Sequence, residues 1–264
     1  MKLLDGMGRR LVESGLFWMT VFALCATLLF SAPAVLLAAN QPERSLPIYC
    51  VQTDQPQIAL TFDAAWGNED LPRILDILAS HQIRATFFMT GDWIEAYPES
   101  VRALAAAGHD LGNHGDTHAH MTELTAAQMA QEIRRAHEKV QEQTGLSMDL
   151  FRPPYGDYND TVIQTAADCG YYAIQWDVDS LDWKDYGADA IVKTVCEHPH
   201  LGNGSIILLH NGATYTAQAL EALIQGLLSQ GYEIVPVSEL IYRSGYQIDH
   251  EGRQSPTTRN PSLQ

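Results

Sequence analysis

The sequence has little positive charge and no closely paired cysteines. Its 264 residues include 16 Lys and Arg against 32 Asp and Glu, which gives a formal net charge of −16. A surface of this sign repels nucleic acid over most of its area, so we expect no nucleic-acid partner. The four cysteines show no CxxC spacing, which argues against a zinc–thiolate site. The sequence leaves open whether two of Cys50, Cys169 and Cys196 form a disulfide or all three are thiols.

Charged residues are also absent from residues 15–39. As a helix that rises about 1.5 Å per residue, this segment is long enough to cross a hydrocarbon layer about 30 Å thick. The basic residues Lys2, Arg9 and Arg10 precede it, so we expect residues 1–14 in the cytoplasm and the rest outside. Small residues at its end also suit cleavage of a signal peptide. Both alternatives export the domain, either on a single-pass anchor in the cell membrane or as a secreted protein.

The rest of the chain divides into three parts. Residues 40–47 are polar and contain two prolines, which is typical of a linker. Residues 48–245 are long enough to form one domain with a sizeable core, and they show no internal repeat. Residues 246–264 are polar and rich in Ser, Thr and Pro, so we expect a disordered tail.

Short apolar runs alternate with amphipathic segments throughout the expected domain. Residues 58–62 predict a buried strand, and apolar side chains then recur at helical spacing over residues 71–78. A capping box from Thr125 to Gln128 begins a long predicted helix, and Gly145 stands just past its end. Further strands are predicted at 85–89, 109–112, 148–152, 171–178, 205–209 and 232–235, and further helices at 100–107, 159–169, 188–197 and 216–229. This alternation predicts an α/β fold with a parallel sheet, either open or closed into a barrel.

Ionisable side chains stand where several predicted strands end. They are Asp63, His114, Arg152, Asp179 and His210. In α/β barrels the active site is built at the carboxyl ends of the strands. One such residue alone would more often be a helix cap or a satisfied polar group, but a set of five indicates an enzyme.

His114 and His118 are four positions apart, a spacing that lets two imidazoles reach one metal ion. A catalytic divalent site usually has a third ligand, commonly a carboxylate, together with open positions for water and substrate. His120 is close enough to this pair to be a spare candidate. The two histidines therefore predict a metal site that the spacing alone leaves incomplete.

Five segments in order along the chain carry a resemblance. They are Thr61–Asp63, His114–His118, Arg152–Tyr155, Asp179–Trp183 and Leu208–His210. Together they resemble the motifs of the polysaccharide deacetylases, the NodB-homology family, which is also carbohydrate esterase family 4. The resemblance extends from Ile58 to Tyr242 and is greatest to the sporulation-associated peptidoglycan deacetylases. It implies a distorted (β/α) barrel for this domain.

The resemblance also implies roles for four ionisable residues. Asp63 corresponds to the general base that takes a proton from water. Arg152 corresponds to the partner that keeps this carboxylate ionised and oriented. His210 corresponds to the general acid that protonates the leaving amine, and Asp182 to the carboxylate that orients and charges its ring.

The implied reaction is the metal-assisted hydrolysis of the N-acetyl group of amino sugars in a cell-surface glycan, with peptidoglycan as the first candidate. The residues expected to contact the substrate are Pro153, Tyr155, Trp183 and Leu208. Tyr155 corresponds to a backbone N–H donor to the oxyanion. Trp183 and Leu208 correspond to walls of the pocket for the acetyl methyl group.

The first motif departs from the family pattern at Ala64, where the family has the aspartate that binds the metal. His114 and His118 then remain as ligands. We therefore expect weak binding of a divalent metal, zinc first and cobalt or manganese as alternatives, with water or Asp70 completing the shell. The departure leaves a second function open, that of a non-catalytic glycan-binding or envelope protein on the same fold.

Overall fold

The computed structural model describes residues 44–257, and the statements below concern these residues. The predicted cytoplasmic segment 1–14, the apolar segment 15–39 and the first half of the predicted linker, residues 40–43, lie outside them. Within the described part, no helix has both the length and the apolar character that crossing a membrane requires. The compact unit begins at Ser45, and Pro47, at the end of the predicted linker, is already buried.

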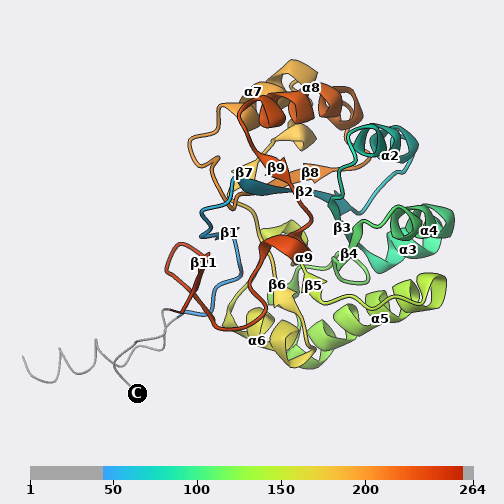
Figure 1. Ribbon diagram of the computed structural model, residues 1–264. Coiled ribbons are helices and arrows are strands. Elements are labelled where there is room, and N and C mark those ends of the chain that lie inside the picture. Colours follow the sequence, from blue (N-terminus) through green and yellow to red (C-terminus); the bar gives the residue numbers. More distant parts are fainter. Residues whose placement is uncertain (1–43, 258–264) are drawn as a thin grey trace, which may run out of the picture. The chain divides into compact units, whose positions relative to one another are not determined.

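A curled sheet of parallel strands forms the centre of this unit (Figure 1). The strands follow the order β6-β5-β4-β3-β2-β8-β7, and β9 pairs with β2. They are β2 (Gln57–Ala64), β3 (Thr86–Met89), β4 (Asp110–Asn113), β5 (Leu150–Phe151), β6 (Tyr172–Ala173), β7 (Val178–Asp179), β8 (Ile206–His210) and β9 (Glu233–Ile234). The predicted parallel α/β sheet is confirmed, except that residues 171–178 form two short strands instead of one.

Helices surround the sheet in Figure 1 and follow the strands in alternation. They are α2 (Leu71–Ser80), α3 (Gly91–Ala96), α4 (Pro98–Ala106), α5 (Ala126–Thr144), α6 (Asp160–Asp168), α7 (Ala188–Cys196), α8 (Thr216–Ser229) and the short α9 (Val237–Leu240). The predicted limits of α5 are confirmed, because Thr125 and Gln128 form the capping box and Gly145 ends the helix in a left-handed conformation. Single 3-10 turns η1 (Met121–Glu123), η2 (Pro154–Gly156) and η3 (Asp182–Lys184) interrupt the loops.

The alternation of side chains along β2 separates the hydrophobic core from the polar inner face of the sheet. Ile58, Leu60 and Phe62 belong to the cluster that contains the buried side chains of α2, α5 and α8. Thr61 and Asp63 therefore point to the opposite, inner face. Because each large apolar side chain buried here contributes roughly 1.5–3 kcal/mol, the outer cluster fixes the register of β2 and the position of Asp63.

The two edges of the sheet lie close together. The chain passes from β6 at one edge to β7 at the other through residues 174–177 alone. The N–H of Ile48 donates to the carbonyl of Ala173 at 2.8 Å, and the N–H of Val51 donates to the carbonyl of Gly204, just before β8, at 2.9 Å. The segment that enters the domain therefore bridges the two sides, and the curled sheet is consistent with the predicted distorted barrel.

The prediction of a disordered tail is wrong for its first part. β10 (Tyr246–Ile248) and β11 (Arg253–Pro256) form an antiparallel pair, and β11 also pairs in parallel with β1 (Cys50–Val51). The polar side chain of Gln254 is fully buried, accepting the N–H of Tyr242 and donating to its carbonyl, each at 2.8 Å. Polar residues suggested disorder, but here their hydrogen bonds are satisfied within the fold. The rest of the segment, from residue 258, lies outside the described residues.

Candidate active site

A cavity of about 450 Å³, here called the polar cavity, opens where β2, β7 and β8 end. It is lined by Asp63, Trp66, His114, His118, Tyr155, Gly156, Trp176, Asp179, Trp183, Leu208 and His210. Its wall thus combines two carboxylates and three imidazoles with apolar and aromatic side chains, a composition typical of sites for small molecules. The predicted convergence of the strand ends is confirmed.

Asp63 is paired with a buried arginine beside the polar cavity. Arg152, the residue after β5, is fully buried, and its Nη1 donates to Oδ1 of Asp63 at 2.6 Å. Burial disfavours the charged carboxylate, but the charge and hydrogen bond of Arg152 outweigh this and hold the pKa of Asp63 below its usual range. The other oxygen, Oδ2, lies 3.5 Å from Nε2 of His114. Asp63 is therefore an ionised carboxylate with one oxygen directed toward the histidines.

His210 is held from behind by Asp182. Nδ1 of His210 lies 2.7 Å from Oδ1 of Asp182, whose Oδ2 accepts the backbone N–H of His210 at 2.7 Å and the hydroxyl of Thr216 at 2.6 Å. Burial by itself would lower the pKa of His210, but the hydrogen bond and charge of Asp182 raise it overall. Asp63 and His210 are paired positions of β2 and β8, so both face the polar cavity. Nε2 of His210 is the ring nitrogen that remains for a substrate.

The two predicted metal ligands lie side by side. Nδ1 of His114 lies 2.7 Å from the carbonyl of Arg152, so that ring nitrogen carries the proton and Nε2 presents its lone pair. The Nε2 atoms of His114 and His118 are 3.3 Å apart. Burial lowers the pKa of both imidazoles, to about 4 for His118, so both are neutral near pH 7. Two neutral imidazoles this close fit a divalent cation as a pair of nitrogen ligands.

The third ligand predicted from the sequence does not reach this pair. Both carboxylate oxygens of Asp70 accept the N–H of Gly212, at 2.9 and 3.0 Å, and Asp70 does not line the polar cavity. Ala64 is fully buried in the helix-facing cluster. Within residues 44–257, no three His, Cys, Asp or Glu side chains form a group suited to a metal ion. The prediction for Asp70 is therefore wrong, because the residue joins two loops instead.

The backbone is strained at several positions around the polar cavity. His118, Tyr155 and Leu181 adopt φ angles of 57°, 60° and 56°. Side chains other than glycine seldom occupy this left-handed region, and such residues concentrate at functional sites. The strain falls on a predicted metal ligand, on the predicted oxyanion residue and on the residue before Asp182, so it agrees with a functional role for these loops.

Three of the four predicted substrate contacts line the polar cavity. Leu208 lies on the inner face of β8, Trp183 follows Asp182 in η3, and Tyr155 is the central residue of η2. The ring of Tyr155 packs against His118 at 4.4 Å between centroids. The fourth, Pro153, is buried beside the cavity without lining it.

Three further lining residues, Trp66, Gly156 and Trp176, were not predicted, whereas Asp179 was expected at the end of its strand. The indole of Trp66 stacks on His210, with 5.3 Å between centroids and 24° between planes. Trp176 lies 5.4 Å from the guanidinium of Arg152, and Asp179 accepts the N–H of Leu181 at 2.8 Å. Trp66 follows Asp63 by three residues in the same loop, so the strand-end rule could have found it. Trp176 lies inside the single strand predicted for residues 171–178, so the strand-end rule did not select it.

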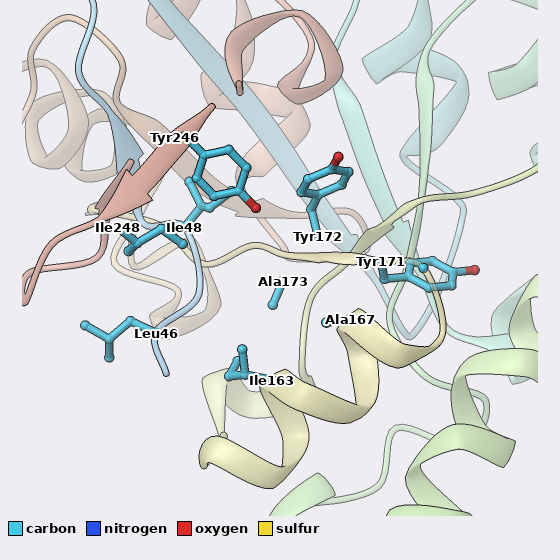
Figure 2. Close-up of a pocket in the computed structure, with 10 residues that line it drawn as sticks. Leu46, Ile48, Ile163, Ala167, Tyr171, Tyr172, Ala173, Tyr246 and Ile248 are labelled. Atoms are coloured by element: carbon cyan, nitrogen blue, oxygen red, sulfur yellow. The ribbon is translucent and has the colours of Figure 1, made fainter. Parts of the chain in front are cut away.

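A second cavity, here called the apolar cavity, lies between α6, β6 and β10 (Figure 2). Its volume is about 310 Å³. It is lined by Leu46, Ile48, Ile163, Ala167, Gly170, Tyr171, Tyr172, Ala173, Tyr246 and Ile248. This lining contains no acid, no histidine and no basic side chain among the described residues. Apart from the hydroxyls of its three tyrosines, the apolar cavity therefore offers packing surface and no group for acid–base chemistry.

Comparisons with other proteins give consistent matches. The family model described as polysaccharide deacetylase matches residues 51–174. An uncharacterized protein of Bacillus subtilis is 35% identical over 209 residues, which are 79% of this chain but only 64% of that protein. The peptidoglycan-N-acetylmuramic acid deacetylase PdaA of Bacillus subtilis is 33% identical over 76% of this chain and 77% of its own length.

Among solved structures, a family 4 pseudoenzyme from Bacillus anthracis is similar, with a TM-score of 0.70 and 33% identity over 74% of this chain and 68% of that one. A mutant of that pseudoenzyme with restored enzymatic activity gives the same TM-score at 34% identity over 74% of this chain and 70% of that one. These similarities cover the domain that carries the polar cavity.

Proposed function

The chain belongs to the polysaccharide deacetylase family, and from that premise we propose that it removes N-acetyl groups from the amino sugars of peptidoglycan by hydrolysis. The observation that carries the proposal is the pairing of an ionised carboxylate with an imidazole of raised pKa across one cavity. Arg152 keeps Asp63 ionised, and the hydrogen bond and charge of Asp182 raise the pKa of His210, which favours its protonated form. A base and an acid with pKa values moved apart in this way are what amide hydrolysis requires.

The residues of the chain then divide the reaction between them. Oδ2 of Asp63 takes a proton from water, because Oδ1 is held by Arg152. The water oxygen forms a bond to the acetamide carbon, and the N–H of Tyr155 stabilises the charge on the carbonyl oxygen. Nε2 of His210 gives its proton to the leaving nitrogen as the C–N bond breaks, since Nδ1 is held by Asp182. The products are acetate and a free amino sugar.

A divalent metal would be held by His114 and His118, and it would polarise the carbonyl and lower the pKa of bound water. Because the described residues provide two imidazole ligands and no carboxylate as a third ligand, we propose weak binding of this metal. Leu208 and Trp183 form an apolar wall of the polar cavity, which suits the acetyl methyl group. We further propose that the domain acts outside the cytoplasm, anchored or secreted through residues 15–39.

A second candidate function is glycan binding without catalysis. Ala64 in place of the family's aspartate favours it, as does the similarity to a pseudoenzyme of family 4. The paired acid and base argue against it, since a binding protein has no use for opposed proton-transfer groups. A mutant of that pseudoenzyme has restored enzymatic activity, so in that relative mutation can recover catalysis.

The experiment that tests the proposal is mass spectrometry of peptidoglycan fragments and chitin oligomers incubated with the purified full-length protein. Hydrolysis predicts products that have lost acetyl groups, together with free acetate. Asp63→Asn is the matched control, because it keeps the volume and hydrogen-bonding shape of the side chain but not the base. Binding of these glycans without loss of acetyl would instead establish the second candidate function.

A further inference from the structure

Three exposed aromatic side chains line the polar cavity. Trp66, Tyr155 and Trp183 expose 43%, 58% and 52% of their surfaces. A group of large apolar side chains exposed at one cavity is typical of a surface that contacts a ligand. Tyr186 is exposed to 69% but does not line the cavity, so it provides an internal comparison.

Trp66 is held by contacts between two loops. The carbonyl of Gly67 accepts hydrogen bonds from Nε1 of Trp93 at 2.7 Å and from Nδ2 of Asn211 at 2.8 Å. Gly212 packs so closely on the indole that a Cβ there would lie 2.9 Å from Cδ1 of Trp66. The exposed ring is therefore fixed before any ligand arrives, which lowers the entropy cost of binding.

The position of Trp66 indicates which part of a substrate it would meet. One face of the indole covers His210, and the side chain also lines the polar cavity. His210 protonates the nitrogen that joins the acetyl group to the sugar, so the sugar lies on the His210 side. The acetyl methyl group points the other way, to Leu208. The apolar C–H face of a pyranose ring suits an exposed aromatic face.

We infer that Trp66 is a specificity residue that stacks on a pyranose ring adjacent to the reacting sugar, so that the site selects a glycan chain over a single amino sugar. This inference rests on the proposed function, because that function places the reacting sugar between Asp63 and His210. The acid–base pair acts on the reacting sugar alone, so it does not determine whether the substrate needs neighbouring sugars.

The test measures binding apart from turnover. Calorimetric titration of the full-length Asp63→Asn protein with N-acetylglucosamine and with its trimer and pentamer gives affinities without hydrolysis. We expect affinity to rise with chain length. Adding Trp66→Ala should weaken pentamer binding about two- to tenfold, the usual range for one aromatic contact, and change monomer binding little. Trp66→Phe should restore most of the loss, and Tyr186→Ala should leave both affinities unchanged.

Several results would overturn the inference. Trp66→Ala could weaken monomer and pentamer equally, which would place the indole at the reacting sugar or behind His210. It could also leave both affinities unchanged, or the Asp63→Asn protein could fail to bind the pentamer. Failure of the proposed function gives a different result, since the wild-type protein would then bind the pentamer more tightly than the monomer but release no acetate from it.

Discussion

The polar cavity, of about 450 Å³, and the apolar cavity, of about 310 Å³, differ in the chemistry of their walls. The polar cavity holds Asp63, His114 and His210, each positioned by a partner behind it, and His118 lies beside His114. The apolar cavity is lined by aliphatic side chains and tyrosines (Figure 2). The chemistry of the wall, and not the presence of a cavity, therefore identifies the functional site in this fold. Buried partners that move pKa values in opposite directions do identify it.

The largest expected effect is on turnover, which should depend on residues of the polar cavity and not on residues of the apolar cavity. Asp63→Asn and His210→Ala should each lower turnover by about 10²–10⁴-fold, because each removes one proton-transfer group. Tyr246→Phe, in the apolar cavity, should leave turnover unchanged. Acetate release from a verified substrate, with circular dichroism to establish folding, measures both. Near-native turnover in a well-folded Asp63→Asn protein would contradict the assignment of catalysis to the polar cavity.

Removal of metal should have the next largest effect. Two imidazoles without a carboxylate should hold zinc weakly, so elemental analysis should find less than one equivalent, lost on dialysis. Chelation should abolish most turnover, and added zinc, cobalt or manganese should restore it. His114→Ala should prevent that recovery, while His200→Ala, an exposed histidine away from the polar cavity, should not.

Ala64→Asp provides the complementary change. It places a carboxylate at the position where the family has its metal ligand, although Ala64 itself belongs to the helix-facing cluster. If the end of β2 turns this carboxylate toward His114 and His118, zinc binding should tighten by about tenfold or more, whereas Ala64→Asn should leave it unchanged. Competition with a chromophoric chelator measures the affinity. A tightly held equivalent of zinc in the unmodified protein would contradict the two-ligand site.

Matched aliphatic truncations should show that the apolar cavity serves packing. Ile48 and Leu208 are both buried, and each lines one of the two cavities. Ile48→Ala and Leu208→Ala should each lower the free energy of unfolding by about 2–5 kcal/mol. Only Leu208→Ala should also change the turnover of folded protein. Denaturant titration and initial rates test this, and a catalytic defect in Ile48→Ala would contradict it.

The smallest effect concerns a half-buried carboxylate, Asp177, that lines neither cavity. Burial raises the pKa of Asp177 to about 6, although its oxygens accept the N–H of Ile206 and the hydroxyl of Ser205. The folded state therefore binds a proton more tightly than the unfolded state, and stability should fall as pH rises from about 4 to about 6. Asp177→Asn should remove this contribution, which is on the order of 1 kcal/mol after solvent screening. An identical slope of stability against pH in both proteins would refute it.

Much of the polar cavity could be predicted because it depends on local sequence. Asp63, His114, Arg152 and His210 each stand where an apolar strand ends, and parallel strands bring those ends to one side of the sheet. Asp182 required the family motif, since its role depends on a contact with His210 across the fold. The geometry of these residues agrees with the prediction.

The parts that escaped prediction depend on contacts distant in the sequence. The hairpin of β10 and β11 forms because β11 pairs with β1, about 200 residues earlier, and no local pattern records that pairing. The sequence suggests Asp70, in the loop that follows Asp63, as an alternative to water in the metal shell, but the loop directs its carboxylate to Gly212. The stack of Trp66 on His210 likewise joins two loops that are remote in the chain.

The most direct test of the central claim is to run the reaction in water enriched in oxygen-18. If Asp63 activates water to attack the acetamide carbon, the released acetate must carry one solvent oxygen and one oxygen from the original amide. We predict singly labelled acetate from the wild-type protein and none above background from Asp63→Asn. Glycan that is bound by the wild-type protein without release of labelled acetate would contradict hydrolysis and leave the polar cavity a binding site.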